Sequence, residues 1–187
     1  MPIEKSNYFI LTGAMGGGKS TVIRSLEQKN IKCIPEPARE ILTEQRLISA
    51  TGVPEEDSDL FTQLMLSRAT SYYKNNRDFQ SNCIIYDRGI PDLIAYAELF
   101  GLDTGIYYKA AKQYTYNPIV FFFKGWQDIY CTDEERKMTY QQASDFGERV
   151  CDIYNELGYQ TIEIPKVSSS DRALFIVNTI QNGGPNE

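Results

Sequence analysis

The 187-residue sequence is 42% hydrophobic and 24% charged, with a net charge of −6, values typical of one globular domain. This acidic balance argues against a nucleic-acid partner, because a basic excess usually makes the phosphate contacts. No apolar run approaches the roughly 20 residues of a membrane span, and the N-terminus lacks a signal-peptide core. We therefore expect a cytoplasmic protein with no membrane contact, with one domain over residues 1–182 and a flexible tail over residues 183–187.

Two residue types restrict the chemistry. The chain contains no histidine, so serine–histidine catalysis is excluded, and any general base must be a carboxylate or the substrate itself. The cysteines, at positions 33, 83, 131 and 151, show no C-x-x-C spacing. We expect reduced thiols rather than disulfides or a zinc site.

A glycine-rich loop lies between the first predicted strand, residues 8–12, and the first predicted helix, residues 20–29. It fits G-x-x-x-x-G-K-[ST], the Walker A pattern of a P-loop, at every fixed position. Its glycines let successive backbone N–H groups point at phosphate oxygens, and the helix start adds its positive dipole end. The sequence therefore predicts nucleoside triphosphate binding by Gly13, Ala14, Met15, Gly16, Gly17, Gly18, Lys19, Ser20 and Thr21.

The next elements surround a short acidic segment. Residues 32–36 are predicted to form a strand that ends where Pro35 and Pro37 disfavour helix and hold Glu36 extended. Residues 39–49 show helical spacing of apolar side chains. An acidic stretch at residues 55–59 favours the start of a further helix, which continues toward Asn75.

The second half of the chain alternates strands with helices. Residues 83–86 read as a strand buried on both faces, followed by helices over residues 90–100 and 104–114. Strands over residues 119–123 and 161–164 flank a helix over residues 139–157, and a helix over residues 170–180 closes the chain. This alternation predicts a three-layer α/β/α fold with a parallel sheet.

Four polar or glycine positions lie at or just beyond the ends of predicted strands: Gly13, Glu36, Asp87 and Lys124. Ligands of such folds gather at the carboxyl ends of the strands, so these positions predict the site. Asp87 follows an apolar strand in the manner of a Walker B acid, and we expect it to hold Mg²⁺ together with the Ser20 hydroxyl. The alternative is an aspartate that caps the turn before Gly89.

The triphosphate and its acceptor require further charged groups. Lys19 is predicted to reach the β- and γ-phosphates, and the planar guanidinium of Arg88 suits a phosphate oxygen, although it could form a surface ion pair instead. Glu36 is the candidate to accept the proton of an attacking hydroxyl, unless it is only a rigid polar turn. Arg39, Arg68 and Arg88 are candidates for acceptor binding, more of them being needed for a monophosphate than for a neutral hydroxyl.

A charged segment between the fourth predicted strand and the long helix has two interpretations. Residues 132–137 read Thr-Asp-Glu-Glu-Arg-Lys, which is typical of a solvated surface. In a phosphotransferase, a loop at this place can close over the phosphates and exclude water. We therefore take residues 125–138 as a candidate lid, with Arg136 ahead of Lys137 as its phosphate ligand.

Taken together, these motifs resemble those of P-loop nucleoside and nucleotide kinases, and most closely those of the small ATPase/kinase domains classed with the AAA-type ATPases. The resemblance rests on the P-loop, Pro35-Glu36-Pro37-Ala38-Arg39-Glu40, Asp87-Arg88-Gly89, Thr132 to Arg136, and Gly158 to Pro165. It covers nearly the whole chain. It implies a five-stranded parallel sheet of order 2-3-1-4-5, flanking helices and a lid.

The same resemblance suggests roles for two residue pairs. Deoxyribonucleoside kinases share the Glu36-Pro37 and Asp87-Arg88 pairs, in which the acid is the general base and the arginine steadies phosphate. Thymidylate-kinase-like enzymes share the aspartate–arginine step. The candidate lid lacks the arginine-dense pattern of both groups, which leaves the acceptor open.

Two functions from different classes remain open. The first is an ATP- and Mg²⁺-dependent kinase acting on a small, nucleoside- or nucleotide-like acceptor, as a monomer or homodimer. The second is a regulatory switch or adaptor that binds and slowly hydrolyses ATP or GTP. The sequence has no N-K-x-D element to read guanine, which favours ATP over GTP.

Overall fold

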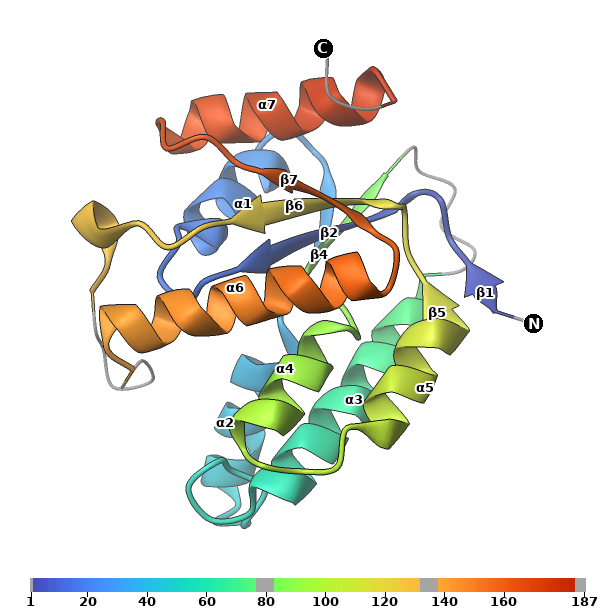
Figure 1. Ribbon diagram of the computed structural model, residues 1–187, viewed down its shortest axis with the longest axis vertical. Coiled ribbons are helices and arrows are strands. Elements are labelled where there is room, and N and C mark those ends of the chain that lie inside the picture. The colour runs from blue at the N-terminus through green and yellow to red at the C-terminus, as the bar shows by residue number, and fades with distance from the viewer. Residues whose placement is uncertain (1, 77–82, 132–137, 184–187) are drawn as a thin grey trace.

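The computed structural model describes residues 2–76, 83–131 and 138–183, and its centre is a five-stranded parallel sheet (Figure 1). The strands in spatial order are β3 (Lys32–Ile34), β4 (Ile84–Asp87), β2 (Tyr8–Gly13), β6 (Ile119–Phe123) and β7 (Gln160–Glu163). Counted along the chain as five core strands, this order is 2-3-1-4-5, so the predicted three-layer fold and strand order are confirmed. All four pairings are parallel, and the carboxyl ends of the strands therefore lie at one edge.

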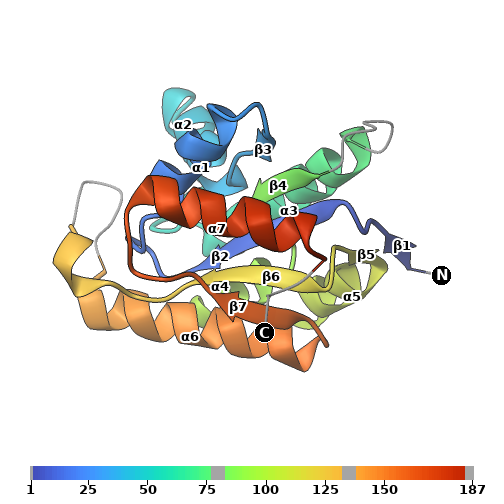
Figure 2. The ribbon, with the colours of Figure 1, turned by 90° about the horizontal axis from the view of Figure 1, so that it is seen from above.

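Helices cover both faces of this sheet. One face packs against α1 (Lys19–Glu27) and α7 (Ser169–Gln181), and Figure 2 shows α7 lying across it. The core on the other face includes side chains of α2 (Pro37–Leu47), α3 (Ser58–Asn75), α4 (Asp92–Leu99), α5 (Gly105–Gln113) and α6 (Tyr140–Glu156). The alternating side chains of β2 show the two layers: Tyr8 and Ile10 join the second core, and Phe9 and Leu11 join the first.

The start of α2 differs from the prediction. The helix begins at Pro37 rather than at residue 39, because proline at the first helical position needs no N–H partner and already has a helical φ. The extended conformation expected of Glu36 is confirmed, with φ −65° and ψ 125° at the N-cap. Glu36 is thus held at the junction between β3 and α2.

Three short elements were not predicted. Strand β1 (Ile3–Glu4) pairs in parallel with β5 (Tyr114–Thr115), and a 3₁₀ helix, η1, spans Gln127–Ile129. Two-residue strands carry no periodicity, so the sequence offers no signal for them. The Tyr73 hydroxyl lies 2.7 Å from the carbonyl oxygens of both Ile3 and Thr115, which ties the small sheet to α3.

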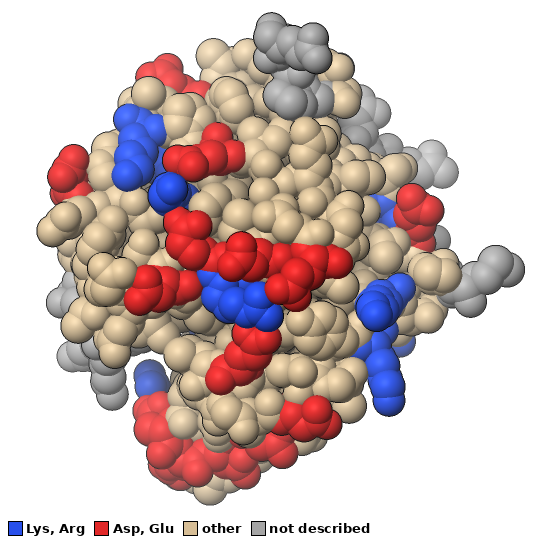
Figure 3. All heavy atoms as spheres, in the orientation of Figure 1, with Lys and Arg blue, Asp and Glu red and all other residues tan. Residues whose placement is uncertain are grey.

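The surface reflects the net negative charge. Acidic side chains predominate on the face that carries α6 (Figure 3), where Arg149 forms ion pairs with Glu98 and Glu156. None of the four cysteines forms a disulfide. Within the described ranges, no helix has the length and apolar character needed to cross a membrane.

Candidate functional site

The glycine loop connects the end of β2 to the start of α1 at the carboxyl edge of the sheet. Gly13 adopts φ +124°, and a Cβ there would lie 2.2 Å from the carbonyl oxygen of Phe123 on the neighbouring strand. Gly18, the N-cap of α1, adopts φ +87°. Residues with a side chain rarely adopt these positive φ values, so glycine is required at both ends of the turn.

Several backbone donors of this loop are left without partners. The N–H groups of Gly16, Gly18, Lys19 and Ser20 make no hydrogen bond within the described part of the chain. Such N–H groups, gathered at the first turn of a helix, are suited to bind an anion, and the helix dipole adds to their positive potential. The predicted phosphate loop therefore offers backbone donors that suit an anion, and its role in nucleotide binding stays a prediction.

The loop opens into a pocket of about 680 Å³. One end, which we call the donor half, is lined by the loop itself and by Trp126, Ile129, Cys131, Met138, Val167, Ser168, Ser169 and Arg172. The other end, the acceptor half, is lined by Glu36, Ala38, Arg39, Leu42, Arg46, Pro54, Glu55, Phe61, Arg88, Tyr96, Leu99 and Phe100. Of the predicted nucleotide-binding residues, Met15, Gly16, Gly18, Lys19, Ser20 and Thr21 line the pocket. Gly13, Ala14 and Gly17 belong to the loop but do not line the pocket.

Lys19, the first residue of α1, lines the pocket. Its side chain is buried, and Nζ donates a 3.4 Å hydrogen bond to the carbonyl oxygen of Ala14 within the loop. Burial, assisted by the neighbouring charge of Arg88, lowers the pKa of Lys19 to about 8. An anion in the loop would reverse this effect, because it favours the charged ammonium form.

Asp87 and Ser20 are the two residues that the sequence predicts to hold Mg²⁺. Asp87 ends β4 directly beside Leu11 of β2, and both Asp87 and Ser20 line the pocket. The Asp87 Oδ1 atom is buried and has no hydrogen-bond partner among the described residues. Burial raises the pKa of Asp87 to about 6, which a divalent cation would oppose. The unpartnered Asp87 oxygen and the Ser20 hydroxyl are both oxygen ligands, the type that Mg²⁺ prefers.

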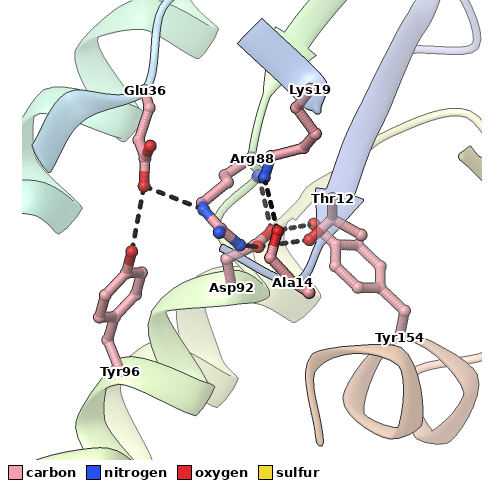
Figure 4. Close-up of polar contacts among 9 residues, drawn as sticks. Thr12, Ala14, Lys19, Glu36, Arg88, Asp92, Tyr96 and Tyr154 are labelled. Atoms are coloured by element: carbon pink, nitrogen blue, oxygen red, sulfur yellow. Dashed lines mark hydrogen bonds and ion pairs between the residues drawn. The ribbon is translucent and has the colours of Figure 1, made fainter. Parts of the chain in front are cut away.

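Two charged residues of the acceptor half, Glu36 and Arg88, belong to one hydrogen-bonded network (Figure 4). Arg88 donates from Nε to Glu36 Oε1 at 2.9 Å, and from its terminal nitrogen to Asp92 Oδ1 at 2.9 Å. The Tyr96 hydroxyl donates to the same Glu36 oxygen at 3.0 Å. Burial raises the pKa of Glu36, but the charges of Arg88 and Lys19 outweigh it and lower the pKa overall. Glu36 is therefore ionised, and its second oxygen, Oε2, makes no hydrogen bond within the described residues.

Asp92 connects this network to the phosphate loop. It is completely buried and accepts hydrogen bonds from the Thr12 hydroxyl at 2.5 Å, the Tyr154 hydroxyl at 2.7 Å and the Gly89 N–H at 2.9 Å. Thr12 directly precedes the glycine loop. Sequence reasoning missed Asp92, because an aspartate near the start of a helix normally indicates only an exposed first turn.

The remaining predicted residues are placed as follows. Arg39 lines the acceptor half, whereas Arg68 does not line the pocket and forms ion pairs of 2.9 Å with Glu40 and 2.7 Å with Glu44. Arg136, predicted as the phosphate ligand of the lid, lies outside the described residues. The substrate roles of Arg39, Arg68 and Arg88 stay predictions.

The donor half contains an arginine that the sequence did not single out. Arg172 of α7 is buried, donates a 3.0 Å hydrogen bond to the carbonyl oxygen of Gly17, and lies 4.6 Å from the ring centre of Phe123. It is also 5.6 Å from the ring centre of Trp126. Burial lowers the pKa of Arg172. Its hydrogen bond to Gly17 and its contact with Phe123 place it against the phosphate loop.

A glycine loop at the carboxyl edge of a 2-3-1-4-5 parallel sheet, with an aspartate at the end of the adjacent strand, defines a P-loop nucleotide-kinase-like protein. Comparison of sequences agrees with this class. A model of the AAA domain family matches residues 8–172, and the chain belongs to this family. No curated protein sequence matches the chain.

Solved structures with the same fold include three kinases. A deoxyadenosine kinase from M. mycoides, with dCMP and dCDP bound, is 15% identical, with a TM-score of 0.67 over 94% of this chain and 99% of that one. A shikimate kinase from Acinetobacter baumannii, in complex with shikimate, is 19% identical, with a TM-score of 0.61 over 95% and 94%. A thymidylate kinase from Candida albicans is 17% identical, with a TM-score of 0.63 over 96% and 92%. At these identities the likeness establishes the fold.

Proposed function

We propose that the protein is an ATP- and Mg²⁺-dependent phosphotransferase that acts on a small, nucleoside- or nucleotide-like acceptor. One observation carries the proposal: a single pocket extends from the phosphate loop to the ionised Glu36, whose Oε2 has no hydrogen-bond partner among the described residues. A protein that only bound a nucleotide would need the donor half alone. The acceptor half provides a place for a second molecule beside the γ-phosphate.

The donor would be held mainly by backbone atoms. The unpartnered N–H groups of the loop would bind phosphate oxygens, and Lys19 would leave the Ala14 carbonyl to contact the β- and γ-phosphates. Ser20 and Asp87 would hold Mg²⁺ through an oxygen of each. When bound, Mg²⁺ would neutralise charge on the β- and γ-phosphates. Because the N–H groups belong to the backbone of a folded loop, they would need little reorganisation during the reaction.

The acceptor hydroxyl would lie against Glu36. Its oxygen forms a bond to the γ-phosphorus while the bond from that phosphorus to the β–γ bridging oxygen breaks, and ADP leaves. The hydroxyl proton passes to Glu36 Oε2. The lowered pKa of Glu36 makes it a weak base, which suits a loose transition state in which the proton moves late. Glu36 would act chiefly by orienting the hydroxyl.

A phosphoryl-transfer screen tests the proposal. The full chain is given labelled ATP or GTP with Mg²⁺ and a panel of nucleosides, nucleoside monophosphates, sugars and vitamins, and hydrolysis without acceptor is the control. We expect at least one acceptor to be phosphorylated well above the hydrolysis rate, with ATP preferred. If no acceptor is phosphorylated while a protein partner binds only the ATP-loaded form, the protein is a nucleotide-dependent switch instead.

A further inference from the structure

We propose that the acceptor is an alcohol that carries no phosphate group, so that the protein phosphorylates a nucleoside-like compound rather than a nucleoside monophosphate. This inference rests on the proposed function and narrows its acceptor. It follows from how the cations of the acceptor half are paired.

The three arginines that line the acceptor half differ in their availability. Arg88 is almost fully buried, with 4% of its side chain exposed, and is shared between the carboxylates of Glu36 and Asp92. Arg46 forms a 3.1 Å ion pair with Glu55 at the edge of the pocket. Among the described residues, only Arg39 lines this half with a guanidinium that has no hydrogen-bond or ion-pair partner.

Arg88 is not available to bind an incoming phosphate. If it turned toward the pocket, the completely buried Asp92 would lose its charged partner and keep only neutral donors. A buried carboxylate without a compensating cation is strongly disfavoured. Arg68 is similarly occupied by Glu40 and Glu44, and it does not line the pocket.

A monophosphate would therefore be poorly neutralised. It carries a charge of about −1.5 to −2 near neutral pH, and it would lie close to the ionised Glu36 and to the γ-phosphate of the donor. Arginine guanidinium groups are the usual ligands for a phosphate group, and in this half only the exposed Arg39 offers one without a partner among the described residues. The negative charges of the monophosphate, Glu36 and the γ-phosphate would repel one another in a partly buried pocket.

A ring-bearing alcohol fits the same space better. Phe61, Phe100 and Leu42 give the acceptor half apolar walls, with the two phenyl rings in edge contact at 6.5 Å between their centres. Glu36 Oε2 offers one acceptor for the reacting hydroxyl. Apolar walls with a few convergent polar groups are typical of sites for small, largely uncharged molecules.

The test uses matched pairs of acceptors. The full chain is assayed with MgATP and each common nucleoside beside its own 5′-monophosphate, and with alcohols beside their phosphate esters. We expect the alcohol of the best pair to be preferred by at least about tenfold in kcat/KM. Equal use, or a preference for the phosphorylated member, would overturn this inference and leave the proposed phosphotransferase standing. No transfer to either member of any pair would instead contradict the proposed function.

A pair of variants tests the charge argument itself. Glu55→Gln removes the partner of Arg46, whereas Glu56→Gln makes the same charge change at an exposed neighbour that does not line the pocket. We expect Glu55→Gln, but not Glu56→Gln, to raise the kcat/KM of the monophosphate relative to its nucleoside by about fivefold, the upper worth of an exposed ion pair. Equal shifts in both variants, or no shift in either, would contradict the argument from paired arginines.

Discussion

The two halves of the pocket are built in different ways. The donor half is formed mainly by the backbone of one contiguous loop, and several of its N–H groups have no partner within the described residues. The acceptor half is formed by side chains from α2, α3, α4 and the segments beside them, and most of its charges are paired with one another. The donor half is thus prepared for an anion, whereas the acceptor half largely satisfies its own charges.

This difference separates general from specific recognition. Backbone donors bind phosphate in any nucleotide, so the donor half depends on loop geometry more than on side-chain identity. The acceptor half depends on which side chains pack together, and it can change while the fold is kept. Mutations in the two halves should therefore have separable effects, and the following predictions test that separation.

The largest effect is expected at Glu36. Replacing Glu36 by glutamine keeps its size but removes its charge, so transfer to the acceptor should fall by roughly 10²–10⁴-fold, while the MgATP affinity stays within a few-fold of the original. Single-turnover transfer and a separate ATP titration measure the two quantities. Glu27→Gln, on the exposed end of α1, is the control for charge. Transfer at the original rate in Glu36→Gln would show that the carboxylate has no role in the reaction.

Asp92 connects Arg88 of the acceptor half to Thr12, which precedes the phosphate loop, so its replacement should lower the stability of the fold. Asp92→Asn leaves Arg88 with one carboxylate, and we expect unfolding free energy to fall by about 3–5 kcal/mol, as is usual when a buried ion pair is broken. Tyr154→Phe removes one neutral hydrogen bond to the same carboxylate and should cost about 1 kcal/mol. Urea unfolding measures both variants. Similar losses in the two would mean that the Arg88–Asp92 pair contributes little.

Lys19 tests the donor half. Lys19→Ala removes a charged partner of the phosphates, and we expect MgATP affinity to fall by about 1.5–3 kcal/mol, with a further loss of turnover. Lys29→Ala, an exposed position outside the pocket, should leave both unchanged. Calorimetry and circular dichroism together measure binding and folding. Unchanged binding and turnover in a folded Lys19→Ala variant would argue against the P-loop role.

The proposed cation site makes a smaller, more specific prediction. If Ser20 and Asp87 hold one Mg²⁺, the losses of MgATP affinity in Ser20→Ala and Asp87→Asn should be non-additive, with an interaction energy of about 0.5–3 kcal/mol. Titrations with and without Mg²⁺ complete the cycle. Strictly additive losses, or tight ATP binding that does not depend on Mg²⁺, would show that the two residues do not share one Mg²⁺.

The smallest expected effect is the uptake of protons when the triphosphate binds. Burial lowers the pKa of Lys19 to about 8, and a bound triphosphate should raise it again, so binding should take up part of a proton at about pH 9 and less at about pH 7.5. Calorimetry in buffers of different ionisation enthalpy measures this uptake. Lys19→Arg is the matched control, because arginine stays charged at both values. Equal uptake in the two proteins would exclude Lys19 as its source.

The sequence determined the sheet and the phosphate loop of the donor half. The Walker A pattern is contiguous, so its strand, turn and helix can be predicted without knowing what packs around them. The strand-end rule likewise predicted that Glu36 and Asp87 would join the loop at one edge, since parallel strands bring their carboxyl ends together. The first residues of α2, the two-residue strands and the three-residue 3₁₀ helix η1 were missed, at the scale where periodicity carries no signal.

The tertiary structure decided which charges are available. Arg88 pairs with Glu36 across 52 positions of sequence, Arg68 reaches Glu40 and Glu44 on a neighbouring helix, and Arg172 lies against the phosphate loop. Each of these contacts depends on how the helices pack on the sheet, because packing decides which partner lies within reach of the guanidinium. Residue type and spacing specify that an arginine is present near a strand end. Only packing specifies whether a carboxylate of the same chain already holds it.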